Sequence, residues 1–146
     1  MKKQVVRTLT MLGLVSVAMV LMVGAAQGQS LGNRIRIDVP FDFNVGDNKL
    51  PAGEYTIGRA QPTSGDIVLQ ISNVDNLGDV FRLTNSAQSI EPKHVNTLVF
   101  HRYGDQYFLF QVWPKGATVG RELPKSRSER EVARQTQYAA VQVKIY

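Results

Sequence analysis

The residue types that most often carry out catalysis are scarce in this chain of 146 residues. There is no cysteine, so nucleophilic catalysis by a thiolate is excluded. A serine–histidine–acid arrangement would need His94 or His101, and no Gly-x-Ser-x-Gly elbow is present to expose a serine. We interpret His101 as a packed or half-exposed strand histidine and His94 as a solvated loop residue. We therefore assign no catalytic residue and expect no enzymatic activity.

Metal and cofactor sites are not predicted either. The two histidines, seven residues apart, lack the paired spacing of zinc ligands. Residues 73–78 have some of the spacing of a calcium loop, but Leu77 and Thr84 stand where ligands are required, so we interpret the segment as a turn. No glycine-rich loop is followed by the lysine and hydroxyl residue that bind phosphate. We expect no metal and no cofactor.

A pair of carboxylates could in principle hydrolyse a glycosidic bond. Asp38 and Asp42 project from the same polar face of the first predicted strand. They would lie about 13 Å apart along an extended chain, too far for either glycosidase mechanism. Glu54 and Asp66 could approach each other in space, which their spacing does not determine. A carboxylate-dependent hydrolase is therefore our third alternative.

One cluster of charge could bind a partner. Arg127, Arg130 and Arg134 are spaced i, i+3 and i+7, on one side of a predicted helix. Such a stripe could contact an anionic envelope surface, such as lipid head groups or lipopolysaccharide phosphates, or an acidic partner. The alternative is a solvated helix face that Glu131, four residues after Arg127, partly neutralises.

This helix is predicted from a capping box. In Ser126-Arg127-Ser128-Glu129 we expect Ser126 and Glu129 to satisfy each other's N–H groups, and the helix to run to about residue 135.

The strongest hairpin signal lies just before the helix, at residues 95–103 and 106–113. The Gly104-Asp105 pair suits a two-residue type II′ turn and fixes the register, with His101 opposite Phe108 and Val99 opposite Phe110. Both faces of this hairpin are apolar, so we expect both to be covered, the second by the helix. The candidate ligand- or core-lining residues are Phe100, Tyr107, Phe108, Phe110 and Trp113.

The remaining elements are short strands. Residues 35–45 alternate apolar and polar side chains, which predicts one strand with an edge position or a bulge at Pro40. Further strands are predicted at 54–59, 66–73, 79–84 and 139–145, and 85–95 is ambiguous. We expect a mainly β domain of about eight antiparallel strands, closed as a barrel or a two-sheet sandwich, with one helix at about 126–135.

The first 28 residues have the pattern of a secretory signal peptide. Lys2, Lys3 and Arg7 precede an uncharged apolar stretch, and small residues offer a cleavage site after Ala26 or Gly28. An uncleaved anchor is the alternative. We expect export through the secretory pathway to the periplasm or the outside, with residues 29–146 as one domain. Removing the three leader cations lowers the net charge from +5 to +2, so no nucleic-acid partner is expected.

Two segments resemble a group of small exported β-rich proteins from soil bacteria that have no assigned activity. The first joins Val39-Pro40-Phe41-Asp42-Phe43 to Leu50-Pro51-Ala52-Gly53-Glu54-Tyr55. The second is Leu98-Val99-Phe100-His101-Arg102-Tyr103-Gly104-Asp105-Gln106-Tyr107-Phe108-Leu109, followed by Glu122-Leu123-Pro124-Lys125-Ser126-Arg127. The resemblance implies that a β-rich exported domain is typical of the group, and it assigns no site.

These observations favour a non-enzymatic binding or interaction module of the cell envelope. Its partner would be an anionic envelope surface or another envelope protein. The alternative from a different class is a β-barrel carrier of a small apolar ligand.

Overall fold

The computed structural model describes residues 34–60, 68–75 and 78–145, which lie in the compact unit formed by residues 31–146. The predicted signal peptide, residues 66–67 of the predicted strand at 66–73 and residues 76–77 of the predicted turn lie outside the described residues. Within the described part there are eleven strands and one helix. In chain order they are β1 (Ile35–Val39), β2 (Phe43–Val45), β3 (Asn48–Leu50), β4 (Gly53–Arg59), β5 (Val68–Asn73), β6 (Asp79–Leu83), β7 (Asn85–Gln88), β8 (Asn96–Tyr103), β9 (Gln106–Trp113), β10 (Val119–Glu122), α2 (Arg127–Ala133) and β11 (Ala139–Ile145).

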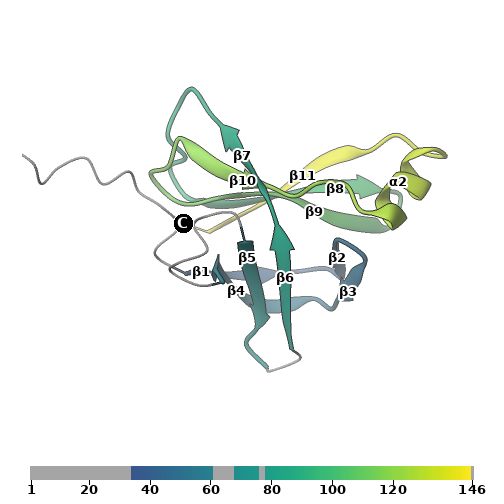
Figure 1. The fold of residues 1–146 in the computed structure, drawn as a ribbon, viewed down its shortest axis with the longest axis horizontal. Coiled ribbons are helices and arrows are strands. Elements are labelled where there is room, and N and C mark those ends of the chain that lie inside the picture. Colours follow the sequence, from purple (N-terminus) through teal and green to yellow (C-terminus); the bar gives the residue numbers. More distant parts are fainter. Residues whose placement is uncertain (1–33, 61–67, 76–77, 146) are drawn as a thin grey trace, which may run out of the picture. The chain divides into compact units, whose positions relative to one another are not determined.

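The strands form two sheets, which Figure 1 shows as two layers. The first sheet has the order β1-β4-β5-β6. The second has seven strands, with the path β11-β8-β9-β10-β7 and with β2 and β3 attached beside β9. The mainly β prediction is confirmed, and of its two forms the sheets are compatible with the sandwich rather than a closed barrel. No helix in the described ranges has the length and apolar character that crossing a membrane requires.

The predicted strand at 35–45 is in fact two strands in different sheets. β1 ends at Val39 and pairs with β4, whereas β2 starts at Phe43 and pairs with β3 and β9. Pro40 lacks the N–H group that would continue the ladder, so the chain leaves the first sheet there. The alternation survives the break because both inner faces meet at the same core, and Phe43 is as buried as Val39.

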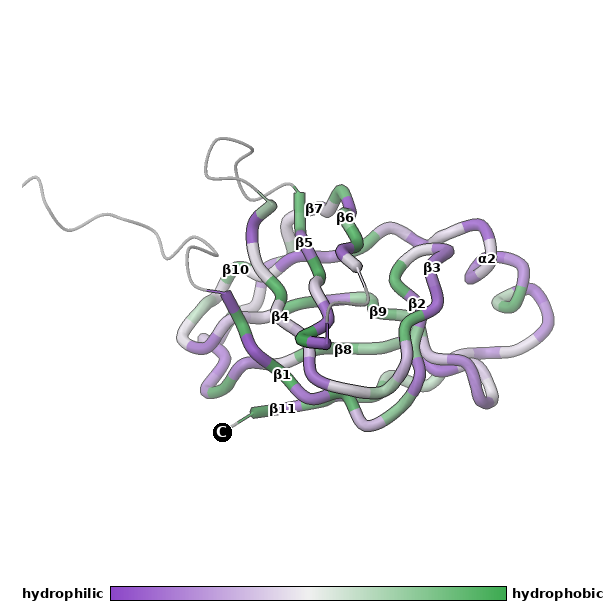
Figure 2. The backbone as a smooth tube through the Cα atoms, turned by 90° about the horizontal axis from the view of Figure 1, so that it is seen from below, coloured by the Kyte–Doolittle hydropathy of each residue, from purple (hydrophilic) through white to green (hydrophobic). Residues whose placement is uncertain are grey.

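The core lies between the two sheets. Buried side chains of β1, β4 and β5 face those of β8 and β9, and the alternating burial of β1 shows that one face of the strand is buried. Phe43, Tyr55 and Phe100 meet ring to ring, with centroids 5.0 Å apart for Phe43 and Tyr55 and 5.5 Å apart for Phe43 and Phe100. Figure 2 shows hydrophobic residues along β8 and β9. Tyr55 and Ile57 point inward, as predicted.

The β8–β9 hairpin has the predicted register at its turn and a different one further along. Gly104 has a φ of 58°, as a glycine in the first turn position requires, and His101 pairs with Phe108. A bulge then shifts the ladder, so that Val99 pairs with Gln111 instead of Phe110. Because of the extra residue, Val112 pairs with Leu98 and lies on the core face.

The ambiguous stretch at 85–95 contains one more strand, β7, which pairs with β10 at the edge of the second sheet. The segment after β7 is held by backbone hydrogen bonds to the β9–β10 connection. Ser89 N–H donates to Thr118 O at 2.8 Å, and Lys93 N–H donates to Ala117 O at 3.1 Å. These hydrogen bonds hold residues 89–95 beside the outer face of the seven-stranded sheet.

Candidate functional site

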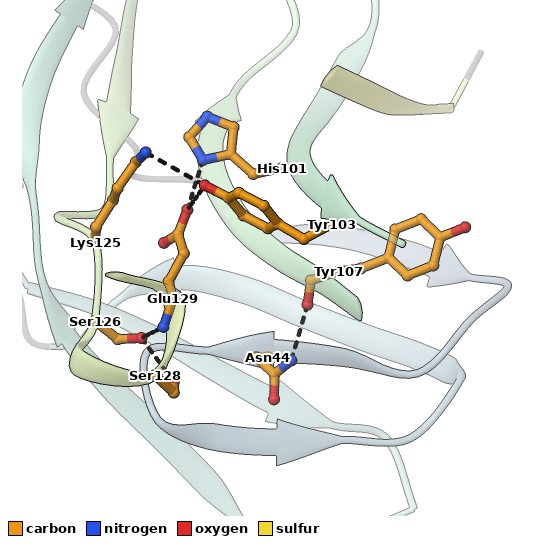
Figure 3. Close-up of polar contacts among 8 residues, drawn as sticks. All are labelled: Asn44, His101, Tyr103, Tyr107, Lys125, Ser126, Ser128 and Glu129. Carbon is orange, nitrogen blue, oxygen red and sulfur yellow. Dashed lines mark hydrogen bonds and ion pairs between the residues drawn. The ribbon is translucent and has the colours of Figure 1, made fainter. Parts of the chain in front are cut away.

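A buried polar cluster joins helix α2 to the outer face of β8 (Figure 3). Glu129 Oε1 lies 2.7 Å from His101 Nδ1 and accepts a 3.2 Å hydrogen bond from the Tyr103 hydroxyl. Lys125 Nζ donates to the same hydroxyl at 3.3 Å. His101, Tyr103 and Glu129 are all buried, at 2%, 3% and 5% exposure. We call these three residues with Lys125 the helix clamp.

The position of Glu129 corrects the predicted capping box. Ser126 Oγ accepts the Glu129 N–H at 3.1 Å, as expected, but the Glu129 carboxylate turns into the sheet instead of returning to Ser126. A second cap comes from the β2–β3 turn, where Asp47 Oδ1 accepts the Ser128 N–H at 3.1 Å and its hydroxyl at 2.8 Å. Because Asp47 and Ser126 together cap this end, the Glu129 side chain is available for the clamp. The helix ends at Ala133, slightly earlier than predicted.

The surroundings of the clamp fix the charge of its outer members. Burial raises the pKa of the Tyr103 hydroxyl, which therefore stays protonated and can donate at neutral pH. The hydrogen bond to Tyr103 raises the pKa of Lys125, which stays charged. Lys125 also lies over the ring of Tyr138, 5.2 Å from its centroid. The clamp therefore carries a charged group at its solvent side.

The His101 ring is enclosed rather than open to a substrate. It stacks on Phe110 with centroids 4.0 Å apart and lies 4.1 Å from the ring of Tyr138 on another side. The prediction of a packed or half-exposed strand histidine is confirmed in its packed form. This buried pair joins α2 to β8.

The predicted basic stripe lies on the outside of this clamped helix. Arg127, Arg130 and Arg134 are all exposed, and Arg134 caps the C-terminal end. Arg127 Nε forms the expected pair with Glu131 Oε1, at 3.2 Å. Since Glu129 faces the sheet, Glu131 is the one acidic side chain that α2 exposes. We call the three arginines, with Lys125 in front of them, the basic face.

The five predicted aromatic residues lie on opposite sides of the hairpin. Phe100 belongs to the core, and Tyr107 stacks on Phe41 at 4.0 Å beside it. Phe108 and Phe110 lie on the outer face with the clamp, where Phe108 meets Tyr103 edge to face. Trp113 is buried on the same outer face, at the far end from the clamp. They therefore do not form one lining.

The hairpin tip is tied down by two further contacts. The Arg102 guanidinium lies 5.4 Å from the ring centroid of Tyr107, a cation–π pair that the predicted register implies. Asn44 Nδ2 donates to Tyr107 O at 3.1 Å and links β2 to β9 (Figure 3). These contacts fix the hairpin end of the sheet on which the clamp rests.

Sequence analysis missed a groove on the outer face of the seven-stranded sheet, about 610 Å³ in volume. Its floor is formed by side chains of β8, β9 and β11, and residues 89–95 form one wall. His94 is exposed at this wall, which confirms its prediction as a solvated loop residue. We call it the outer groove; it is lined by Ser89, Ile90, Glu91, Pro92, Lys93, His94, Val95, Thr97, Val99, Gln111, Trp113, Gln142 and Lys144.

Two of the carboxylates considered in the sequence analysis, Asp42 and Glu54, are engaged by other groups in the described residues. Asp42 accepts the Ala52 N–H at 3.0 Å, and this bond lowers the pKa of its carboxyl group. Glu54 is paired with Arg36, which lowers the pKa of Glu54 as well. Asp66 lies outside the described residues. Across the described ranges, no group of three or more metal-ligating side chains is present.

Comparisons with protein-family models, with curated proteins and with solved structures found no match to this chain.

Proposed function

We propose that the protein is an exported, non-enzymatic binding module of the cell envelope that contacts anionic surfaces through the basic face. The observation that carries the proposal is the orientation of α2. The clamp buries Glu129 and leaves Arg127, Arg130 and Arg134 exposed on a helix that cannot rotate freely against the sheet.

The charge balance of this face supports an anionic partner. Lys125 and the three arginines outnumber Glu131 and the capping Asp47, the exposed acids on and beside the helix, because the other acid of the helix is buried. Basic residues near an anionic membrane contribute about 1 kcal/mol each to binding. A face with these charges suits phosphate groups, whether on lipid head groups or on lipopolysaccharide.

Export and the lack of catalysis are supported by the sequence. The leader at 1–28 has the charged, apolar and small-residue regions of a signal peptide. His101, the histidine with an acidic partner, is packed between rings, while His94 lies at the outer groove. The five aromatic residues that would line the cavity of an apolar-ligand carrier lie on opposite faces of the hairpin and form no common lining, so we do not propose that alternative.

The test compares vesicle binding by the parent chain and by a variant in which Arg127, Arg130 and Arg134 are changed to Gln. With phosphatidylcholine vesicles that contain phosphatidylglycerol, at low salt, we expect the variant to bind roughly a hundredfold more weakly, since about 3 kcal/mol is removed. Binding by the parent should weaken as salt is added, and pure phosphatidylcholine should not bind.

The matched control changes Arg34, Lys49 and Lys115 to Gln, which removes the same charge from other exposed positions. We expect this control to bind nearly as well as the parent. Lipopolysaccharide in place of the vesicles distinguishes the two phosphate sources. Equal loss of binding in both variants would mean that net charge, and not the basic face, governs attachment. Equal binding by all three forms would overturn the proposal.

A further inference from the structure

The outer groove lies at the opposite end of β8 from the clamp and is independent of the basic face. Every second residue of the paired strands contributes its side chain to the floor. Residues that pair across a ladder project to the same face, so the floor continues from one strand to the next. Thr97 pairs with Trp113 and with Lys144, and Val99 pairs with Gln111 and with Gln142. Three adjacent strands therefore present one continuous surface to the groove.

β8, the middle strand of the floor, can recognise a ligand only through its side chains. β8 lies between β11 and β9, so its backbone N–H and C=O groups are used in the two ladders. An extended peptide that adds a strand needs a free sheet edge, and the floor of the groove is a face. The floor also lacks a deep apolar pocket for a peptide anchor, since Trp113 is only 4% exposed and is covered by Lys93.

The polar groups of the floor are oriented before any ligand arrives. Gln111 Oε1 accepts the Trp113 Nε1–H at 3.1 Å, and Gln111 Nε2 donates to Glu122 Oε2 at 2.8 Å. These contacts hold the amide in one orientation and leave it one further donor and acceptor site. Gln142 is exposed beside it on β11. One fixed and one exposed amide, next to a hydroxyl and an indole, suit a ligand that is rich in hydroxyl groups.

The walls of the groove add positive charge. Lys93 Nζ is held 4.9 Å from the ring centroid of Trp113, and Lys144 is exposed on the opposite side, at the edge strand. His94 adds a third nitrogen base, while Glu91 is the one acidic side chain of the lining. Two ammonium groups on either side of a hydroxyl-binding floor are complementary to a carboxylate-bearing sugar.

We propose that the outer groove binds an acidic oligosaccharide, a chain of sugars that carry carboxylate groups. The ammonium groups of Lys93 and Lys144 bind the carboxylates, and the amides of Gln111 and Gln142 bind the ring hydroxyls. The volume of about 610 Å³ lies within the range of small-ligand sites, and the groove is open to solvent, so a longer chain can extend beyond it.

The experiment uses the fluorescence of Trp113, the sole tryptophan of the chain, which reports on the groove directly. The parent chain is titrated with an oligomer of galacturonic acid and with its fully methyl-esterified form, which keeps the hydroxyls but not the charges. We expect a saturable fluorescence change with the acid and at least tenfold weaker binding of the ester. Calorimetry of the same titrations checks that the fluorescence change reflects binding.

Two variants of equal charge locate the binding. Changing Lys93 and Lys144 to Gln should weaken binding of the acidic oligomer about tenfold, as expected for two exposed ion pairs. The matched control changes Lys49 and Lys115 to Gln and should bind like the parent. Because Lys93 lies over the reporter ring, the affinities of the variants are compared by calorimetry. Thermal unfolding of each variant verifies that the fold is retained.

Several results would overturn the proposal. The first is that the acidic oligomer causes neither heat nor a fluorescence change. The second is that the methyl ester binds as tightly as the acid, and the third is that the variant with Lys93 and Lys144 changed to Gln binds the acid as tightly as the parent chain. A peptide of glutamic acid with the same number of charges serves as the competing ligand. If it binds as tightly as the oligosaccharide, the groove recognises acidic polymers in general and the assignment to sugars is wrong.

Discussion

The two ends of the outer face of β8 and β9 are built from the same hairpin and have opposite characters. At the hairpin turn, α2 and Tyr138 cover the face, and a buried His101–Glu129 pair joins the layers. At the other end, residues 89–95 stand beside the face and leave the outer groove open. The closed end is held by few, well-matched polar contacts, whereas the open end exposes its polar groups to solvent.

This difference shows what covering a sheet face demands. A buried carboxylate is tolerated only where it is paired and hydrogen-bonded, and Glu129 has two partners for this reason. The exposed Gln142 and Lys144 need no such partners. Substitutions at the closed end should therefore change stability, while those at the open end should change binding.

The largest expected effect is at the closed end. Changing Glu129 to Ala leaves His101 and Tyr103 buried without their acceptor, and should lower the free energy of unfolding by about 3 kcal/mol. Urea unfolding measures it. Glu131→Ala, which removes the exposed acid of the same helix, is the control and should cost about 0.5 kcal/mol or less. Equal losses in the two variants would contradict a structural role for the clamp.

A smaller effect is expected beneath the floor of the open end. A Cβ atom at Gly120 would lie 2.6 Å from ring atoms of Trp113 and 2.8 Å from Val112 O. Gly120→Ala should therefore destabilise by about 2 kcal/mol and shift the tryptophan emission. Thr118→Ala, at an exposed position two residues earlier, is the control. An unchanged emission spectrum in Gly120→Ala would show that this packing is wrong.

The smallest effect concerns the second cap of α2 and depends on pH. The hydrogen bond from the Ser128 N–H lowers the pKa of Asp47, so the ionised carboxylate stabilises the folded state. This contribution is present above the unfolded-state pKa of about 4 and is lost as the pH falls through the folded-state value.

The change Asp47→Asn should therefore lower the melting temperature at neutral pH, and the difference from the parent should shrink as the pH falls below about 4. Asp105→Asn, in the exposed β8–β9 turn, serves as the control. If the melting temperatures of the parent and of Asp47→Asn differ by as much below pH 4 as at neutral pH, the stabilising role of the ionised cap is refuted.

Local signals in the sequence were sufficient for the longer strands, the helix and part of the pairing, but not for the short strands β3, β7 and β10. Gly104-Asp105 predicted the turn and the first four pairs of the hairpin, because a two-residue loop permits one register. The bulge between the Phe100 and Val99 pairs was not predicted, because it depends on how the side chains pack on both faces of the hairpin. Ser126 predicted the start of the helix, because an N-cap depends only on residues close to it in the sequence.

The candidate sites were less accessible to prediction because they depend on distant partners. Asp47 caps Ser128 from the β2–β3 turn, and without that contact Glu129 would be expected to complete the capping box. The outer groove depends on residues 89–95, whose course is set by hydrogen bonds to Ala117 and Thr118. The polar alternation of Gln142 and Lys144 in the last strand was the one local sign of this surface.

The division of β1 and β2 between the sheets has a consequence for the order of folding. All strands of the four-stranded sheet have been synthesised once Leu83 is added, and their pairings are local. The apolar side of that sheet is covered only after the β8–β9 hairpin has been synthesised. The pairing of β2 with β9, at Asn44 and Phe108, also forms only then. A nascent chain of intermediate length thus exposes the apolar face of the four-stranded sheet. At this stage of biosynthesis a chaperone would be needed most.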